Sequence, residues 1–167
     1  KILALDVHQH RLDLIESACR RLGVNIVETI LLDARELAEK IGQKADYLLV
    51  DVPCSGLGVI RRRPELRWRV KAGDLPLHAQ QQLEILGQAA LCLKPGGKLV
   101  YSTCSLESEE NEDQIRRFLA DHPDFRVDLP DNFATDFPLD RMAEGYLTLP
   151  RVDGPDGFFM TRLVKSK

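Results

Sequence analysis

The sequence predicts an α/β fold in which a mainly parallel sheet carries helices on both faces. Short, continuous apolar runs alternate along the chain with segments of helical periodicity, which is the pattern of β-α-β units. Three of these runs end directly in an aspartate, at Asp6, Asp33 and Asp51. In an open sheet of this kind, ligands bind beyond the carboxyl ends of the strands. We therefore expect the functional site at that edge of the sheet.

The amino-terminal elements follow from the spacing of the apolar residues. We expect strands at residues 2–5, 26–32 and 47–50, and helices at residues 12–22 and 36–41. The strands are continuous apolar runs, which are typical of strands buried on both faces. Gly23 follows the first helix and is well placed to end it in a left-handed conformation, and Gly42 stops the second.

The second half of the chain begins with an irregular stretch, residues 52–77, that is interrupted by prolines and glycines. The strongest helix follows, and its apolar face comprises Leu83, Leu86, Ala90 and Leu93. We expect residues 95–97, Pro-Gly-Gly, to end this helix, and residues 99–102 to form a fourth strand. A further helix carries Ile115, Phe118 and Leu119. We interpret the acidic residues 107–113 before it as helix-start and solvent-face residues.

The end of the chain predicts an antiparallel edge to the sheet. Short β-like segments lie at residues 125–127, 146–149 and 158–163, and a turn-rich stretch, residues 153–157, separates the last two. A chain of 167 residues with 44% hydrophobic residues can bury a core of its own. We therefore treat residues 1–167 as a single domain.

The composition argues against several classes of protein. A net charge of −3 argues against binding nucleic acid by bulk charge alone, although it is compatible with a local basic face. No apolar run approaches the ~20 residues that span a bilayer, so we expect no membrane partner. The first residues form no basic and apolar leader, so we do not expect secretion.

The four cysteines contain no Cys-x-x-Cys pair, and the four histidines do not cluster with them, so we expect no zinc or other metal. We take the thiols as free and the compartment as reducing, which predicts a cytoplasmic protein. Cys19 and Cys92 lie within amphipathic helix patterns and are expected to be buried structural residues.

Cys54 and Cys104, by contrast, each follow the end of a predicted strand and lie among Pro, Ser, Thr and Gly residues. If the two strands are neighbours, both thiols face one crevice. A helix start just after Cys104 would favour its thiolate, whereas the acids from Glu107 onward would oppose it. We expect Gly56 and Gly58, beyond Cys54, to let the backbone approach a ligand closely.

The three strand-end aspartates, Asp6, Asp33 and Asp51, have two interpretations. Any one of them can serve only as a turn former or helix cap. Three in succession favour a ligand, because a carboxylate after the second strand of such a sheet is well placed to accept hydrogen bonds from ribose hydroxyls. The sequence therefore points to a cofactor that contains a nucleoside.

A basic segment follows the Pro53-Cys54 pair. It holds six cations within eleven residues, with one aromatic residue between them: Arg61, Arg62, Arg63, Arg67, Trp68, Arg69 and Lys71. A run of charge is often only a solvated surface. Its position beside the predicted site favours binding of a phosphate backbone, with the tryptophan as a stacking face.

At this point the sequence resembles the S-adenosylmethionine-dependent RNA cytosine-C5 methyltransferases, and within them the bacterial Sun/Fmu-like enzymes that modify small-subunit ribosomal RNA. The matching segments are residues 51–62 (DVPCSGLGVIRR), 93–97 (LKPGG), 101–105 (YSTCS) with 109–111 (EEN), and 156–159 (DGFF). The pairing of Pro-Cys with Thr-Cys is specific to this group, because the DNA cytosine methyltransferases are similar only at Pro-Cys.

The resemblance implies a catalytic role for three residues. Cys104, the Thr-Cys cysteine, would add as a thiolate to C6 of cytosine, because C5 alone is too weak a nucleophile to attack a sulfonium methyl group. Cys54, the Pro-Cys cysteine, would take part in the later elimination. Asp51 would lie near N3 and N4 of the base and stabilise the charge that develops there.

The resemblance also implies binding residues for a cofactor and an RNA. S-adenosylmethionine would lie against Asp6 through its ribose, Asp33 through its adenine amine, and Asp51 and Pro53. Five residues of the basic segment would bind RNA, most simply ribosomal RNA: Arg61, Arg62, Arg63, Arg67 and Trp68.

One departure from the family is large. The glycine-rich turn that cradles the methionine part of the cofactor should precede Asp6 by a few tens of residues, and no Gly-x-Gly segment is present. We therefore expect a Rossmann-like domain that lacks its first strand, which would be a central one. We expect this chain by itself to bind S-adenosylmethionine weakly or not at all and to turn over no substrate. Isothermal titration tests this, and micromolar affinity would contradict it. Two other functions stay open: a non-catalytic RNA-binding remnant, and a dithiol redox or acyl-transfer enzyme.

Overall fold

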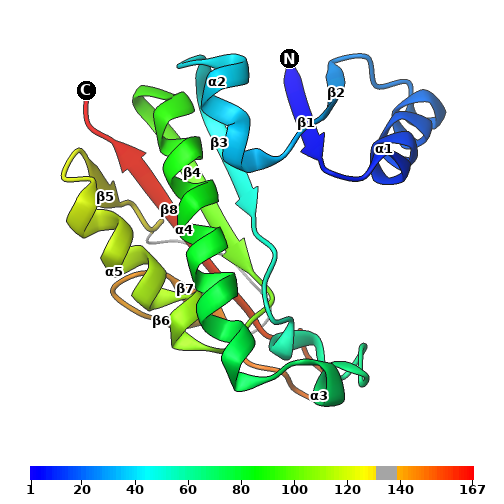
Figure 1. The fold of residues 1–167 in the computed structure, drawn as a ribbon, viewed down its shortest axis with the longest axis vertical. Helices are drawn as coiled ribbons and strands as arrows, with labels where there is room; N and C mark the ends of the chain where they lie inside the picture. Colours follow the sequence, from blue (N-terminus) through cyan, green and yellow to red (C-terminus); the bar gives the residue numbers. More distant parts are fainter. Residues whose placement is uncertain (131–138) are drawn as a thin grey trace.

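The computed structural model describes residues 1–130 and 139–167 and contains two sheets (Figure 1). The smaller sheet pairs β1 (Ile2–Asp6) in parallel with β2 (Val27–Leu31). The larger sheet has the order β3-β4-β8-β7-β6, with β5 paired to β8. Its strands are β3 (Ala45–Asp51), β4 (Leu93–Thr103), β5 (Phe125–Val127), β6 (Asp140–Arg141), β7 (Tyr146–Thr148) and β8 (Phe158–Lys165). The predicted α/β class is confirmed.

The first unit of the chain is β1, α1 (Gln9–Leu22) and β2. Leu12 is the buried residue of α1, and Gly23 ends the helix at φ 68°. The N–H groups of Gly23 and Val24 donate to the carbonyls of Arg20 and Cys19, which is a Schellman motif and confirms the predicted helix end. In the part of the chain that is described, β1 does not pair with β3, and Figure 1 shows the unit set to one side of the larger sheet.

β3 differs from the prediction of a strand buried on both faces. Val50 is buried and Leu48 packs against the core, but Tyr47 and Leu49 are 77% and 74% exposed. Successive side chains of a strand point to opposite faces, so only one face of β3 is covered by the described elements. The apolar run therefore predicted the strand correctly and its second face incorrectly.

The core lies between the larger sheet and two helices, α4 (Leu75–Cys92) and α5 (Glu112–Asp121), which run across one face of it in Figure 1. Its fully buried side chains come from both layers: Leu86, Leu93, Leu99, Tyr101, Ile115, Phe118, Phe159 and Leu163. Cys92, at the end of α4, is buried as predicted, whereas Cys19 on α1 is only partly buried. The core thus fixes β3, β4 and β8 as one rigid platform.

The Pro-Gly-Gly segment at residues 95–97 does not end α4 as predicted, because the helix stops at Cys92 and the segment lies within β4. Ala45 pairs with Leu93 and Tyr47 with Lys98, so β4 advances by five residues between these two pairs while β3 advances by two. A proline cannot donate to the ladder and is tolerated at such an irregularity. β4 is therefore longer than the predicted strand, and Leu93 belongs to it rather than to the helix.

The predicted antiparallel edge is confirmed, because β8 runs antiparallel to β4 and to β7. β6, which the sequence analysis did not predict, pairs with β7. The remaining elements are short: η1 (Ala34–Glu36), α2 (Leu37–Ile41), η2 (Leu57–Val59), α3 (Leu66–Arg69), η3 (Ala72–Asp74) and η4 (Ser108–Glu110). Across the described ranges, no helix has the length and apolar character needed to cross a membrane.

Candidate functional site

The two cysteines that follow strand ends lie in contact. β3 and β4 are parallel neighbours, with Asp51 opposite Ser102, so the loops that leave them start side by side. The Sγ atoms of Cys54 and Cys104 are 3.3 Å apart, and both side chains are partly accessible. The expectation that both thiols meet at the carboxyl edge of the sheet is met because the two strands are adjacent.

The environment shifts the pKa values of the two thiols in opposite directions. A hydrogen bond from Cys54 lowers the pKa of Cys104 to about 7, with help from the positive charge of Arg63. The same contact, together with burial, raises the pKa of Cys54 far above its ordinary value. Burial and the negative charge of Asp51 oppose the ionisation of Cys104 and raise its pKa. The arrangement therefore provides one thiolate and one thiol near neutral pH.

This inequality predicts a pH dependence of alkylation. Because the thiolate is the nucleophile, Cys104 should react with iodoacetamide with a midpoint near pH 7, while Cys54 stays unreactive. Free glutathione, an ordinary thiol with a pKa of about 8.5, is the reference. Peptide mass spectrometry across the range measures it. Cys54→Ala should move the midpoint of Cys104 upward, and a midpoint that stays at its wild-type value in this variant would contradict the assignment.

Asp51 lies at the same edge, at the end of β3. Its Oδ1 accepts a hydrogen bond of 2.9 Å from Ser102 Oγ, and the residue is exposed. The exposed Pro53 accepts a bond from Gln82 Nε2 through its carbonyl oxygen, at 2.9 Å. Asp51 therefore stands beside the thiols with an oxygen, Oδ2, left to meet a ligand.

Asp6 ends β1, Asp33 lies two residues beyond the end of β2, and the two make the same local turn. His8 N donates to Asp6 Oδ1 at 2.8 Å, and Arg35 N donates to Asp33 Oδ1 at 2.9 Å. In each case the donor is two residues ahead, which is the Asx turn weighed in the sequence analysis. The structure therefore gives both carboxylates a local role and places them at one edge.

The two carboxylates differ in what they have left to offer a ligand. Asp6 has one further contact, with Arg11 NH1 at 3.3 Å, so part of its capacity of about four acceptor sites is free. Asp33 is held by the Arg35 guanidinium through Nε and NH2, which keeps the pKa of the carboxyl below its ordinary value. Asp6 can thus accept ribose hydroxyls as it stands, whereas Asp33 must compete with Arg35.

The basic segment divides into a structural part and an exposed part. Arg61 donates to the carbonyls of residues 151, 152 and 154 and to Asp156, and Arg62 forms an ion pair with the same carboxylate. Asp156 is only 5% exposed. These two arginines therefore hold the turn between β7 and β8 in place.

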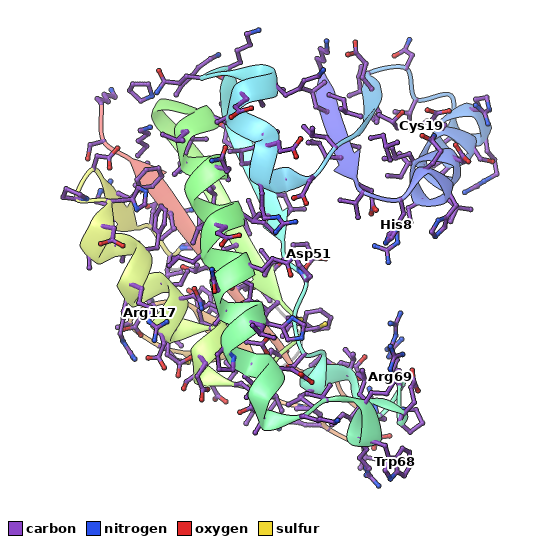
Figure 2. All side chains as sticks on the ribbon, viewed as in Figure 1. His8, Cys19, Asp51, Trp68, Arg69 and Arg117 are labelled. Atoms are coloured by element: carbon purple, nitrogen blue, oxygen red, sulfur yellow. The ribbon has the colours of Figure 1, made fainter. Side chains whose placement is uncertain are left out.

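The exposed part contains Arg63, Arg67, Trp68 and Arg69. Within residues 1–130 and 139–167, none of these three arginines forms an ion pair, and Trp68 is 75% exposed. Trp68 and Arg69 lie at the outer end of the molecule in Figure 2. This part of the segment is free to meet a ligand.

Gly58 joins three loops through its backbone. Its N–H donates to the carbonyl of Cys104 at 2.9 Å, and its carbonyl accepts from Gly157 N at 2.8 Å. A Cβ on Gly58 would lie 2.2 Å from Gly157 O and 2.9 Å from Cys104 O. The glycine thus allows close approach of protein backbone rather than of a ligand, which corrects the sequence interpretation. Gly56 takes φ 73°, a value that favours glycine.

Glu110 was misassigned by the sequence analysis. It was interpreted as one of the solvent-face residues 107–113, but its side chain is fully buried. Gln114 is also fully buried, and Glu110, Gln114 and Phe118 follow one another at a spacing of four. In the structure Glu110 ends η4, and Asn111 separates it from α5, so the spacing of four with Phe118 is a signal of burial in the sequence and not one continuous helical face.

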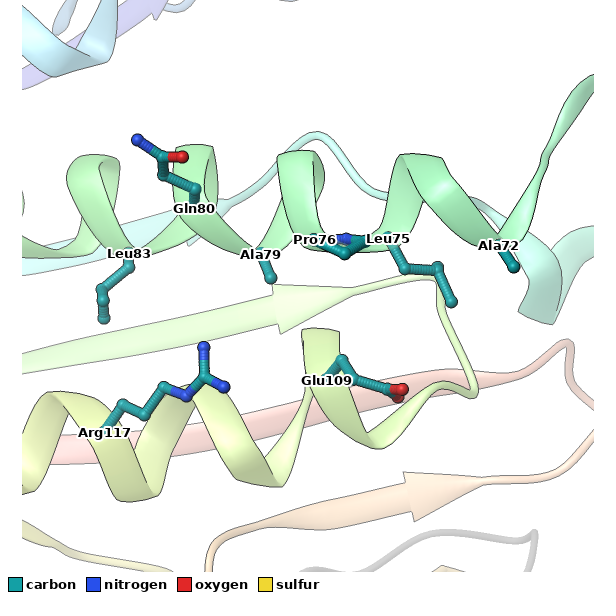
Figure 3. Close-up of a pocket in the computed structure, with 8 residues that line it drawn as sticks. All are labelled: Ala72, Leu75, Pro76, Ala79, Gln80, Leu83, Glu109 and Arg117. Atoms are coloured by element: carbon teal, nitrogen blue, oxygen red, sulfur yellow. The ribbon is translucent and has the colours of Figure 1, made fainter.

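A pocket of about 410 Å³ lies between α4 and α5, away from the thiols. Its lining includes Leu75, Ala79 and Leu83 from α4, and Glu109 and Arg117 from the facing segment (Figure 3). None of the site residues named above lines it. Within the described residues, no group of His, Cys, Asp or Glu side chains is arranged to hold a metal ion.

Comparisons with known proteins show which family the chain belongs to. Residues 1–164 match the model of the family described as 16S rRNA methyltransferase RsmB/F. The chain is 40% identical over 98% of its length to the probable ribosomal RNA small subunit methyltransferase B of Bacillus subtilis, and 39% identical over its full length to the ribosomal RNA small subunit methyltransferase B of Klebsiella pneumoniae. It spans 37% of the length of each of these relatives.

A solved structure is similar to the chain as well. The crystal structure of NSun6 from Pyrococcus horikoshii superposes on the whole chain with a TM-score of 0.86 at 34% identity, and the chain covers 42% of it. A family match over nearly all of the sequence, together with relatives at about 40% identity, establishes the relationship. The chain belongs to the RsmB/F family of 16S rRNA methyltransferases.

Proposed function

We propose that the protein carrying this chain methylates C5 of a cytosine in small-subunit ribosomal RNA, with S-adenosylmethionine as the methyl donor. The observation that carries the proposal is the pair of thiols, 3.3 Å apart, at the carboxyl ends of two adjacent parallel strands, with the pKa of Cys104 lowered to about 7. The curated relatives are named for small-subunit rRNA methylation, and the crystal structure of NSun6 is one with SFG.

The chemistry requires the inequality of the two thiols. Cytosine C5 becomes nucleophilic only after a thiolate adds at C6 and electron density moves onto C5. Cys104, the thiol with the lowered pKa, forms this bond, and Asp51 stabilises the charge that builds up at N3 and N4. When bound, S-adenosylmethionine supplies an electrophilic methyl group. The final elimination removes the proton from C5 and breaks the bond to C6, which releases Cys104 as a thiolate, and we assign Cys54, the thiol with the raised pKa, to this release step.

The residues present fit part of the cofactor. Asp6 has acceptor capacity for ribose hydroxyls, and Asp51 and Pro53 lie exposed at the same carboxyl edge. Asp33 contacts the adenine amine only if its bond to Arg35 yields. We assign the ribose to Asp6 first, and we place the reaction in the cytoplasm, where free thiols stay reduced.

RNA binding is assigned to the exposed part of the basic segment. Arg63, Arg67 and Trp68 offer charge to the phosphates and a face for a base. Arg61 and Arg62, which the sequence analysis also assigned to RNA, act by holding the loop through Asp156.

Trp68→Ala should weaken RNA binding by about 1 to 3 kcal/mol, because a stacked base loses its aromatic partner. Arg67→Ala should weaken it less, and should reduce the salt dependence by roughly one phosphate contact. Fluorescence anisotropy with a single-stranded rRNA fragment at several salt concentrations measures both. Lys40→Ala is the control, because it is an equally exposed cation on α2, at the opposite end of the sheet. Equal losses in Lys40→Ala and Arg67→Ala would point to bulk charge instead.

The reaction itself is tested by incubating the complete protein with unmodified small-subunit rRNA and S-adenosylmethionine, followed by nucleoside mass spectrometry. We expect 5-methylcytidine at one position. Methylation of a ring nitrogen or a ribose oxygen would overturn the cytosine-C5 assignment, and no methylation at all would overturn the reaction class. A dithiol redox enzyme is the second candidate, and only the 3.3 Å contact of the two sulfurs favours it.

A further inference from the structure

Glu110 is a buried carboxylate at the junction of the two cysteine loops. Its side chain is fully buried and accepts four hydrogen bonds. Ser55 N and Gln82 Nε2 donate to Oε1 at 2.8 and 3.0 Å. The hydroxyls of Ser55 and Ser105 donate to Oε2, each at 2.5 Å. Among the ion pairs of the described residues none involves Glu110, so these neutral donors alone offset the cost of burying its charge.

The two serines that Glu110 holds are the residues that follow the two thiols. Ser55 comes directly after Cys54, and Ser105 comes directly after Cys104. Each hydroxyl has one proton, and both protons go to Oε2. The 3.1 Å approach of the two hydroxyl oxygens is therefore a result of their shared acceptor. One carboxylate thus joins loops that are 50 residues apart in the sequence.

A second set of hydrogen bonds holds the backbone around Glu110 in place. Tyr101 Oη donates to the backbone carbonyl of Glu110 at 2.7 Å. Thr103 Oγ1 donates to Asn111 Oδ1 at 2.6 Å, and Asn111 Nδ2 donates to the carbonyl of Ser105 at 3.1 Å. These bonds tie η4 to the end of β4, the strand that leads into Cys104. The backbone at Glu110 is therefore anchored to the end of β4, and its side chain binds both cysteine loops.

We infer that Glu110 is a positioning residue that holds Cys54 and Cys104 in mutual contact. If the loops separate, a buried carboxylate loses the donors of one serine, and an underbonded buried charge is costly. Glu110 touches neither thiol, so it acts through Ser55 and Ser105. The relevance of the contact to catalysis rests on the proposed function, but the positioning itself is measurable on the thiols alone.

The test replaces Glu110 by glutamine in the complete protein. Glu110→Gln removes the negative charge that both hydroxyls share, and its NH2 group can meet the serine oxygens only if both hydroxyls turn and accept, which weakens the ties between the loops. Oxidation by diamide joins two thiols only when they meet, and we expect disulfide formation between Cys54 and Cys104 to slow by roughly tenfold or more. The alkylation midpoint of Cys104 should also rise, because the hydrogen bond from Cys54 is lost. Glu109→Gln, the same change at the exposed neighbour, should alter neither readout.

A second variant covers the case in which Glu110→Gln does not fold. Ser105→Ala removes one of the two hydroxyl donors and should slow the disulfide by a smaller factor. Wild-type disulfide rates and alkylation midpoints in a folded variant would overturn the inference, and so would a lower melting temperature with unchanged thiols. A protein that methylates nothing but whose thiols respond as expected would overturn the proposed function and leave the positioning role intact.

Discussion

Replacing Cys104 by alanine is expected to abolish the covalent bond to RNA and to lower methyl transfer by roughly 10⁴-fold or more, the scale seen when an enzyme loses its nucleophile. No other group in the site can take its place. Cys54 is the nearest thiol, 3.3 Å away in the wild type, and burial still raises its pKa when the contact with Cys104 is removed. RNA that contains 5-fluorocytosine measures the bond directly, because fluorine at C5 blocks the elimination and the protein stays attached.

The matched variant is Cys54→Ala, one thiol away. If Cys54 acts in release, this variant should still form the adduct and should accumulate it on ordinary RNA as well. An adduct that disappears in Cys54→Ala and persists in Cys104→Ala would transfer the role of nucleophile to Cys54. Denaturing gel electrophoresis separates the free protein from the protein–RNA adduct.

Gly58→Ala is expected to lower the free energy of unfolding by about 3 kcal/mol, the upper part of the range for overpacking. The added Cβ would sit 2.2 Å from the carbonyl oxygen of Gly157, so the backbone of one loop must shift. The shift would stretch the hydrogen bond from Gly58 N to Cys104 O and disturb the thiol pair. Denaturant unfolding measures the stability, and the diamide reaction measures the thiols.

Gly87→Ala is the control for this substitution. Gly87 lies inside α4, and outside its own helix turn and chain neighbours no atom lies within 4 Å of an added Cβ, so alanine should raise stability by about 0.5 to 1 kcal/mol through helix propensity. Opposite signs at the two glycines would show that the contact, and not the loss of glycine, sets the cost. An unfolding midpoint of Gly58→Ala equal to that of the wild type would contradict the close approach.

Some elements were predicted wrongly from the sequence, for physical reasons. The run at residues 47–50 is apolar throughout, but periodicity cannot report whether both faces of a strand are covered, and Tyr47 and Leu49 are exposed. The Pro-Gly-Gly segment is a strong local signal for a turn, yet the pairing of β4 with β3 absorbs it as an irregularity. Both outcomes depend on contacts between elements: whether a second layer covers β3, and how β4 pairs with β3. Local sequence patterns do not contain this information.

The sequence by itself determined the α/β class, the strands that lead to Asp6, Asp33 and Asp51, and the candidacy of the two cysteines. These depend on local patterns, and parallel strands bring their carboxyl ends to one edge whatever the details. The tertiary structure alone decided which polar groups meet. Arg61 binds Asp156 across 95 positions, and Glu110 binds Ser55 across 55. Such partners are brought together by packing in three dimensions. The basic run therefore did not reveal that Arg61 holds a distant turn, and the acidic run did not reveal that Glu110 is buried.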